Sequence, residues 1–289
     1  MVTMSMNELP AHALVERLFG LTTRPAEERV VCISARCAHG VKSVDIDRPV
    51  LAVVLCGQKQ VHSGTRSRDL GPGDLLAMAP GARLDVVNRP DPVVGRYLTL
   101  SIPLCDQVLA AARQLCAQPV PPSGLGFTTL PISALQSEWE AFAEAVEQDD
   151  ETQARLAVLR ILMRLAHTGF GDLLLPASPT LSARVRGIVT QAPARRWRSA
   201  DFEDALAISG ATLRRRLASE GPASLRDLIA QARLACALEM LYTTRSPVKT
   251  VAHRVGYRSV ESFARRFRDR YGLDASSIGN APEETHLSI

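Results

Sequence analysis

Arginine is concentrated in one short segment near the C-terminus: residues 265–270 read RRFRDR, so four of these six residues are arginine. A planar guanidinium group binds guanine edges and backbone phosphates, often through two hydrogen bonds at once. A cluster of this kind favours contact with nucleic acid. The alternative is a basic surface that only faces solvent, and the residues around the segment decide between the two.

The segment is expected to be one face of an amphipathic helix. Apolar side chains recur at intervals of three, four and four residues, close to the 3.6 residues of a helical turn. They are Val260, Phe263, Phe267 and Tyr271. With this stripe buried, the other side chains point outward or to the flanks. The candidate DNA contacts are Glu261, Ser262, Arg265, Arg266 and Arg268, together with Arg258 just before the helix.

A shorter helix is predicted directly before it. In SPVKTVAHRV the apolar residues again keep helical spacing, and Pro247 is acceptable in a first turn. Gly256 is expected to end this helix, because glycine readily takes the left-handed conformation there. Ser259 is a suitable N-cap for the next helix. Two helices joined by a turn of three or four residues that contains glycine form a helix-turn-helix. The second helix of such a unit enters the DNA major groove.

An equivalent unit is predicted in DFEDALAISGATLRRRLASEG. Its first helix would end near Leu206, and its second would begin near Ala211 with Leu213 and Leu217 inside. The outward candidates are Ala211, Arg214 and Arg215. Between the two units, SLRDLIAQARLACALEMLY predicts a rigid helix that spans roughly 27 Å. Recognition helices held apart in this way would enter successive major grooves, which repeat every ~34 Å.

The sequence from about Trp197 to Gly272 resembles the AraC/XylS family of bacterial transcription regulators. The resemblance rests on RLACALEML followed by VKTVAHRVGYRSVESFARRFRDRYG. The matching motif positions are Arg233, Ala252, Gly256, Tyr257, Phe263, Phe267 and Gly272. The family implies that one chain contacts two grooves of double-stranded DNA and controls promoters. It favours an activator that recruits RNA polymerase, with repression as the alternative.

Two positions depart from the family pattern. After Gly272 the family usually has a proline and then a tyrosine–arginine pair, whereas this chain reads LDASSIGN, which predicts a short or frayed last helix. Glu203 lies where the family usually has a small residue packed on the first recognition helix. We therefore expect the first unit to read fewer bases than the second.

The charge of the chain is unevenly distributed. From Pro176 to the end there are 18 Lys and Arg and 11 Asp and Glu, a net charge of +7, whereas residues 1–175 carry −3. This asymmetry favours DNA binding by the C-terminal half alone. No run approaches the ~18 apolar residues of a membrane span, and the N-terminus lacks the basic start of a signal peptide. The six cysteines predict buried, reduced thiols in a cytoplasmic protein, with a Cys32–Cys37 redox pair as the alternative.

Short β-rich stretches at intervals of about ten residues run from Val30 to Ile102 and predict an antiparallel sandwich or barrel. LGPGDLLAMAPGARLDVV resembles the cupin domain that often precedes AraC-type domains. Metal-dependent cupins surround a transition metal with imidazoles and a carboxylate. Here His62 is isolated, and the chain has no His-x-His motif. We therefore expect no metal site, no cofactor and no enzymatic activity.

Helical periodicity returns from Pro131 to Leu175. A broad apolar stripe is formed by Leu156, Leu159, Ile161, Leu162 and Leu165. It would either cover the barrel or pair two subunits. The segment PASP at 176–179 is expected to be a linker. These limits give a sensing or dimerisation domain over 1–175 and a DNA-binding domain over 180–289.

The sequence thus predicts a two-domain α+β protein. A cupin-like antiparallel β-barrel followed by helices precedes an all-α domain with two helix-turn-helix units. We expect a homodimeric regulator that binds promoter DNA and responds to a small-molecule effector. The alternatives are a barrel that is packed solid and only dimerises, control by a protein partner instead of a small ligand, and an enzymatic cupin fused to a DNA-binding domain.

Overall fold

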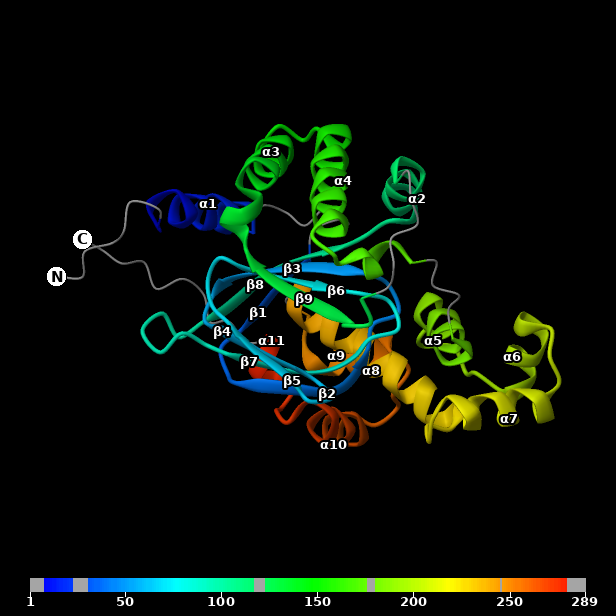
Figure 1. Ribbon diagram of the computed structural model, residues 1–289. Coiled ribbons are helices and arrows are strands. Elements are labelled where there is room, and N and C mark those ends of the chain that lie inside the picture. Colours follow the sequence, from blue (N-terminus) through cyan, green and yellow to red (C-terminus); the bar gives the residue numbers. More distant parts are fainter. Residues whose placement is uncertain (1–7, 23–30, 117–122, 176–179, 245, 280–289) are drawn as a thin grey trace. The chain divides into compact units, whose positions relative to one another are not determined.

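The computed structural model describes residues 8–22, 31–116, 123–175, 180–244 and 246–279 (Figure 1). The chain divides into two compact units, and along the sequence they part between Ser178 and Pro179. Strands and helices make up the first unit, and the described part of the second contains helices, so the predicted two-domain α+β class is confirmed. The predicted limits of 1–175 and 180–289 stay predictions, and the expected linker at 176–179 lies outside the described residues.

Two antiparallel sheets form the centre of the N-terminal unit. One has the order β1-β8-β3-β6-β9 and the other the order β2-β7-β4-β5. The strands of the first sheet are β1 (Val31–Ala35), β8 (Tyr97–Pro103), β3 (Val50–Cys56), β6 (Asp74–Met78) and β9 (Phe127–Pro131). Those of the second are β2 (His39–Asp45), β7 (Arg83–Arg89), β4 (Gln58–Ser63) and β5 (Arg66–Leu70). The predicted antiparallel β architecture is confirmed.

The first sheet is buried on both faces, as its central strand β3 shows. Alternate side chains of a strand point to opposite faces of a sheet. In β3, Leu51, Val53 and Leu55 pack into a core that includes the helices of this unit. Ala52 and Val54, on the other face, are buried as well. This explains why VLAVVLC is continuously apolar, although an antiparallel strand with one solvated face would alternate.

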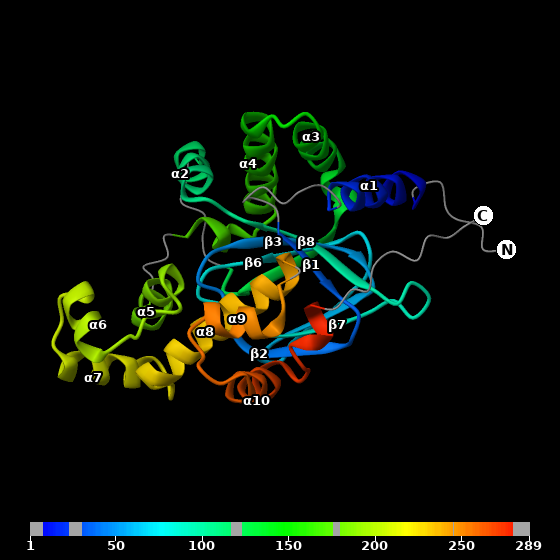
Figure 2. The ribbon, with the colours of Figure 1, turned by 180° about the vertical axis from the view of Figure 1, so that it is seen from behind.

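The helices of this unit cover the outer face of the first sheet. They are α1 (Glu8–Leu21), α2 (Asp106–Leu115), α3 (Gln136–Glu147) and α4 (Glu151–His167). Figures 1 and 2 show α1, α3 and α4 on one side of the sheets, next to β3. Arg17 in α1 donates two hydrogen bonds to the carboxylate of Glu147, 2.8 and 2.6 Å long. The sequence patterns predicted α3 and α4 but neither α1 nor α2.

The apolar stripe predicted on α4 is correct except at one end. Ile161, Leu162 and Leu165 are buried in the core of the unit, and Leu159 is half-buried. Leu156 is instead 42% exposed. Its neighbours Ala157 and Val158 are buried. At 100° per residue, these two share one side of the helix with Ile161 and Leu162, and Leu156 points away from that side. The stripe therefore mainly covers the sheet, as one of the two expectations had it.

A polar cluster lies among the buried residues of the two sheets. Lys59 in β4 donates a 2.8 Å hydrogen bond to Oδ1 of Asn88 in β7, and Nδ2 of Asn88 lies 3.0 Å from Nε2 of His39 in β2. The Lys59 ammonium is 5.5 Å from the ring centroid of Tyr97, whose hydroxyl is hydrogen-bonded to Thr99. Burial lowers the pKa of Lys59 to about 7, because desolvation disfavours the charged form.

The C-terminal unit contains the helices that the sequence predicted, preceded by one that it did not, α5 (Leu181–Gln191). The others are α6 (Ser199–Leu206), α7 (Gly210–Glu220), α8 (Leu225–Thr243), α9 (Val248–Arg254), α10 (Val260–Tyr271) and α11 (Ser276–Gly279). The pairs α6/α7 and α9/α10 are the two predicted helix-turn-helix units. Helix α11 has four residues, in agreement with the expected short last helix.

The long helix α8 is buried on more than one side. Leu228 and Ala232 pack into the core of the first helix-turn-helix unit, with α5, α6 and α7. Leu234 and Ala237 are also buried. The helix begins with Ser224 as N-cap, which accepts a hydrogen bond from the Asp227 backbone and donates to the Asp227 carboxylate. A helix buried along several faces in this way is held firmly, which supports its predicted role as a spacer.

The described residues also bear on cysteines, membrane spans and metal ligands. None of the six cysteines, all within the described residues, forms a disulfide; Cys37 is exposed and the other five are half-buried rather than fully buried. Within the described residues, no helix is long and apolar enough to cross a membrane. In the same residues no cluster of three or more His, Cys, Asp or Glu is arranged to hold a metal ion.

Candidate nucleic-acid interface

Helix α10 turns its arginines outward because its aromatic side chains are buried. Phe263 and Phe267 have no solvent exposure and Tyr271 has 3%. Their ring centroids are 5.4 and 4.6 Å apart along the helix, as expected for aromatic pairs that pack edge to face or tilted. Ser259 caps the N-terminus by accepting a 3.0 Å hydrogen bond from the backbone N–H of Ser262, and Gly272 ends the helix with φ +73°.

The candidate contacts on α10 fall into three groups. Arg258, Glu261 and Arg265 are exposed. Ser262 and Arg266 are half-buried on one flank of the helix. Arg268 is exposed, but its Nε donates a 2.7 Å hydrogen bond to Oδ1 of Asp274, with which it forms an ion pair. The structure therefore leaves Arg265 as the outward arginine at the centre of this helix and engages Arg268 with a neighbouring carboxylate.

Helix α7, in the first unit, exposes the residues that the sequence selected. Leu213 and Leu217 are buried, as predicted, and pack against Phe202 and Leu206 of α6. The outward residues Ala211, Arg214 and Arg215 are exposed. Ser209 is the N-cap and accepts a 3.3 Å hydrogen bond from the backbone of Thr212. This unit has the same architecture as the second, with leucines in place of the aromatic stripe.

The unusual Glu203 of α6 is accommodated by Gly210, the first residue of α7. A Cβ on Gly210 would lie 2.6 Å from Oε1 of Glu203, so the glycine leaves space for the carboxylate in its present position. Glu203 also accepts a 2.8 Å hydrogen bond from the Ser199 hydroxyl. Because a helix N-terminus attracts negative charge, the carboxylate is favourably placed beside α7. The turn itself places Ala207 in the left-handed region, with φ +53°.

The turn of the second unit needs its glycine for two reasons. Gly256 has φ +88°, a conformation that disfavours any side chain. A Cβ at this position would lie 2.8 Å from the carbonyl oxygen of Pro193 and 3.0 Å from Cα of Ala194. The turn is therefore packed directly on the loop that precedes the first unit, which links the two helix-turn-helix units within this half of the chain.

Arg233 of α8 reinforces this junction. Its Nε donates a 2.9 Å hydrogen bond to the carbonyl of Pro193, and one terminal nitrogen donates another of 2.9 Å to the carbonyl of Arg195. Burial lowers the pKa of Arg233, but a guanidinium starts from so high a value that it stays charged. The family motif therefore has a structural role at this position: it fixes the loop before α6 to the linker helix.

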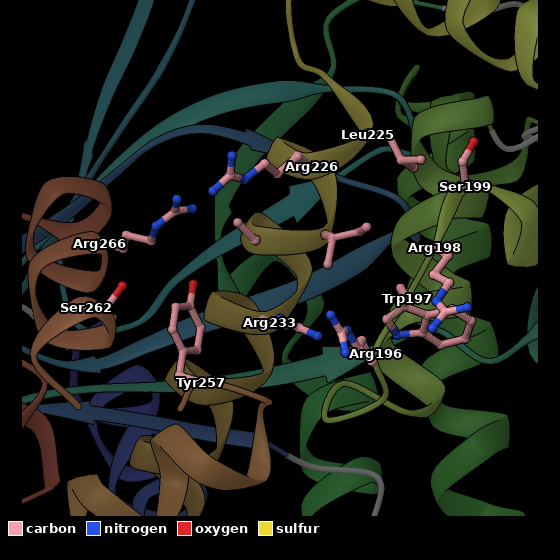
Figure 3. A pocket seen from close by; sticks show the side chains of 12 residues that line it. Arg196, Trp197, Arg198, Ser199, Leu225, Arg226, Arg233, Tyr257, Ser262 and Arg266 are labelled. Carbon is pink, nitrogen blue, oxygen red and sulfur yellow. The ribbon is translucent and has the colours of Figure 1, made fainter. Parts of the chain in front are cut away.

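A groove of about 540 Å³ lies beside this junction, and we call it the arginine groove (Figure 3). None of its twelve lining residues is acidic and five are arginine. The five are Arg196, Arg198, Arg226, Arg233 and Arg266. Trp197, Tyr257 and Ser262 also line it. In Figure 3 the side chains of Arg226 and Arg266, from α8 and α10, extend toward the same space.

The sequence patterns predicted DNA contacts at only two of the groove residues, Ser262 and Arg266. Arg196, Arg198 and Arg226 were missed, because a contact assembled from three separate segments has no period along the chain. The available signal was the arginine-rich stretch ARRWR at 194–198 directly before the first unit. Asp227, which follows Arg226 in α8, lies close to the groove; hydrogen bonds from the Ser224 side chain and backbone, together with the charges of Arg266 and Arg226, hold its pKa below the usual value.

This arrangement suits an extended polyanion. Exposed arginines on α7 and α10 can reach base edges and phosphates, and the groove between the segments adds cationic groups with no acidic lining residue. Positive charge on one side of a helical unit is the electrostatic footprint of a nucleic-acid-binding surface.

Comparisons with known proteins agree with this geometry. A family model described as "Helix-turn-helix domain" matches residues 203–279. A second model, described as "AraC-like ligand binding domain", matches residues 30–172. Together they cover most of the chain, with one match in each structural unit.

Curated relatives are transcription regulators. Over 160 residues the chain is 29% identical to the HTH-type transcriptional regulator YdeO of Escherichia coli K12, which covers 55% of this chain and 62% of the relative. It is 34% identical over 91 residues to the urease operon transcriptional activator of Escherichia coli, covering 32% of this chain and 30% of that protein. These matches span less than two thirds of each relative.

Solved structures share the fold. ToxT of Vibrio cholerae in an apo form matches with a TM-score of 0.67 and 13% identity over 88% of this chain and 97% of that chain. The structure of ToxT bound to an unsaturated fatty acid matches with a TM-score of 0.64 and 14% identity, covering 89% and 100%. At such low identity the likeness establishes the fold alone.

Proposed function

Because the chain belongs to the AraC family of DNA-binding transcription regulators, we propose that it is an activator whose N-terminal domain binds a small-molecule effector. Promoter DNA is bound by the C-terminal domain, and the bound protein recruits RNA polymerase. Action on a bacterial promoter implies a cytoplasmic protein. The observation that carries the proposal is the pairing, in one chain, of a ligand-binding-domain match with two helix-turn-helix units that expose arginines on their second helices.

Activation is supported by the relatives' names. One is called the urease operon transcriptional activator, and VirF of Shigella flexneri, 29% identical over 97 residues, is called a virulence regulon transcriptional activator. Response to a small molecule is supported by the matched ligand-binding model and by the fatty acid bound to ToxT. The test of activation is transcription in vitro from a bound promoter with purified polymerase, where addition of the protein should increase the transcript. A decrease would identify a repressor.

The base-reading role belongs to Arg265. It is exposed at the centre of the outward face of α10, and Arg265→Ala should weaken specific binding by about 1–3 kcal/mol and relax preference at one base position. Arg268 should contact a phosphate while Asp274 orients it, so Arg268→Ala should weaken binding to all sequences equally and lower the salt slope by about one. Gel-shift titrations on specific and random duplexes at several salt concentrations measure both. Equal behaviour of the two variants contradicts these roles.

The two-domain sensor model is tested by separating the domains. Residues 180–289 alone should fold and bind the DNA site weakly as a monomer. The full chain should bind more tightly as a homodimer, because joining two binding modules raises their effective concentration. Only the full chain should respond to the effector. A fragment that keeps the effector response contradicts the model.

Control by a protein partner in place of a small ligand is the alternative. A thermal-shift screen of metabolites on the full chain distinguishes them, since a ligand that binds the folded state raises the melting temperature according to ln(1+[L]/Kd). Binding of one compound, lost together with its effect on DNA occupancy in a barrel variant, supports the small-molecule effector. The interior Lys59–Asn88–His39 cluster offers the polar groups for such a variant.

A further inference from the structure

We propose that the arginine groove is a third DNA contact, a phosphate-binding site that holds the backbone segment lying between the two half-sites. This inference rests on the proposed DNA-binding function and deepens it. The contact lies apart from the outward faces of α7 and α10, so it contributes affinity and spacing instead of base recognition.

The position of the groove along the chain supports this assignment. Its walls come from the segment before α6, from the N-terminal half of α8 and from the flank of α10. Helix α8 therefore lines the groove and also joins the two helix-turn-helix units. When two recognition helices enter successive major grooves on one face of DNA, the region between them presents a minor groove and the two phosphate strands beside it. A cationic groove on the segment that joins the two units suits those phosphates.

The chemistry of the groove matches phosphate. Guanidinium groups bind phosphate oxygens through paired hydrogen bonds, and several of them facing one space repel each other unless an anion lies between them. Arg226 and Arg266 extend toward the same space in Figure 3. No carboxylate is among the lining residues; the adjacent Asp227 is hydrogen-bonded to Ser224, and the charges of Arg266 and Arg226 also help to lower its pKa. At about 540 Å³, the groove is larger than one tetrahedral anion needs and suits a run of linked phosphates.

The walls of the groove are also fixed before any ligand arrives. Arg233 holds the loop before α6 through the carbonyls of Pro193 and Arg195. The Trp197 indole donates a 3.1 Å hydrogen bond to the Ala192 carbonyl, and the Arg195 guanidinium stacks 4.5 Å from the centroid of its ring. A preformed site loses little conformational entropy on binding. Fixed walls also set the distance between the half-sites, so the spacer length of the DNA should be strictly defined.

The experiment is a thermodynamic cycle on the full-length protein. A duplex is first selected from random sequence by the full chain, and the half-sites are mapped by footprinting. Spacer phosphates are then replaced by methylphosphonates, which removes their charge without changing the bases. The protein changes are Arg226→Gln and Arg196→Gln, both at exposed positions. Arg184→Gln is the matched control, since Arg184 is exposed on α5 and does not line the groove.

We expect each lost phosphate contact to weaken binding roughly fivefold near 0.15 M salt and to lower the slope of log K against log salt by about 0.9. Neutralising the spacer should cost the wild type this amount and cost Arg226→Gln much less, because the contact is already absent. Arg184→Gln should behave as wild type. Phosphates outside the spacer, neutralised in a second duplex, should cost wild type and Arg226→Gln equally.

Three results would overturn the inference. Additive effects of spacer neutralisation and Arg226→Gln would show that the groove does not touch these phosphates. The second result is that neutralising the spacer phosphates does not change binding, while pyrophosphate raises the melting temperature of the wild type but not of Arg226→Gln. The groove would then be a small-anion site instead. Failure to select any duplex would reject the proposed DNA-binding function as well, whereas either of the first two results leaves that function intact.

Discussion

In the N-terminal unit Lys59 is buried with a single amide oxygen 2.8 Å away, whereas in the C-terminal unit Arg233 donates to two backbone carbonyls, each at 2.9 Å. Lys59 is buried and Arg233 is half-buried, so both cations lose hydration, but the consequences differ. Lysine can lose its proton, and burial brings its pKa to about 7. Arginine keeps its charge, so its cost must be offset by hydrogen bonds that are strengthened by that charge.

The two cations therefore have different roles: Lys59 belongs to an interior that can titrate, whereas Arg233 belongs to a structural joint. The Lys59 cluster leaves the sheet interior with a group that changes charge near neutral pH, in the domain that matches a ligand-binding model. Arg233 and Gly256 instead hold the two helix-turn-helix units against each other. The chain provides a reporter for each region, since its two tryptophans are Trp139 in the N-terminal unit and Trp197 in the C-terminal unit. Replacing one by phenylalanine leaves the other as the fluorescent probe.

The largest effect is expected at the joint, for Gly256→Ala. The new Cβ would be 2.8 Å from the Pro193 carbonyl oxygen, and the residue would keep a positive φ. Left-handed strain and overpacking together should lower the free energy of unfolding of the C-terminal unit by about 3–5 kcal/mol. Urea denaturation followed by Trp197 fluorescence measures this. Gly272→Ala is the control, because φ is +73° there but no atom lies within 4 Å of the new Cβ. It should cost only about 1 kcal/mol, and equal losses for the two variants would contradict the close packing of the joint.

Arg233→Met should follow, with a loss of about 2–4 kcal/mol for the same unit. The substitution keeps an apolar stem but leaves the carbonyls of Pro193 and Arg195 without their charged donor. Arg226→Met, on the same helix but exposed, should change stability by less than about 0.5 kcal/mol. If Arg233→Met unfolds at the same urea concentration as the wild type, the contrast between Lys59 and Arg233 is lost.

Lys59→Met should stabilise the N-terminal unit, in contrast to the two substitutions above, and the gain should depend on pH. The folded-state pKa of Lys59 is about 7 and the ordinary value is 10.5, so between these values the unfolded state binds more protons and the wild-type stability rises with pH. Below pH 7 the full penalty of the buried charge is present. Lys59→Met should therefore be more stable than wild type at pH 6, and its advantage should shrink toward pH 9.

The measurement is urea denaturation from pH 6 to pH 9, followed by Trp139 fluorescence. The wild-type slope in this window should approach about 1.4 kcal/mol per pH unit for one proton. Lys42→Met, at an exposed position of β2, should leave the wild-type slope unchanged. If wild type and Lys59→Met have parallel pH profiles, Lys59 does not titrate in the interior.

The smallest effect is expected where a cation is exposed. Arg268 and Asp274 form an ion pair with side chains that are 61% and 47% exposed. Arg268→Ala should lower the stability of the C-terminal unit by at most about 1 kcal/mol, and 1 M salt should abolish the difference. A larger, salt-independent loss in the Trp197 transition would show that this pair, too, belongs to the structural joint.

Local spacing was sufficient to predict the recognition helices. The stripe through Phe263 and Phe267, the cap at Ser259 and the stop at Gly272 all act within a few residues, so their outcome can be inferred from the chain itself. Lys59 shows the limit. It lies two residues before the buried Val61 in β4, so both side chains point to the same face of the sheet. This spacing was the only hint that the lysine would point inward. Glu203 looked unfavourable on its own, and only its neighbour Gly210 shows how the carboxylate fits.

The sequence by itself determined the two helix-turn-helix units, the outward arginines and the β-rich N-terminal half, because hydrophobic periodicity and helix caps are local properties. The tertiary structure decided which cations are paired, which are buried and which share a space. Arg196, Arg226 and Arg266 belong to three separate segments, and they line one groove only because Arg233 and Gly256 hold those segments together. Charge interactions depend on distance in space, and the fold alone sets that distance.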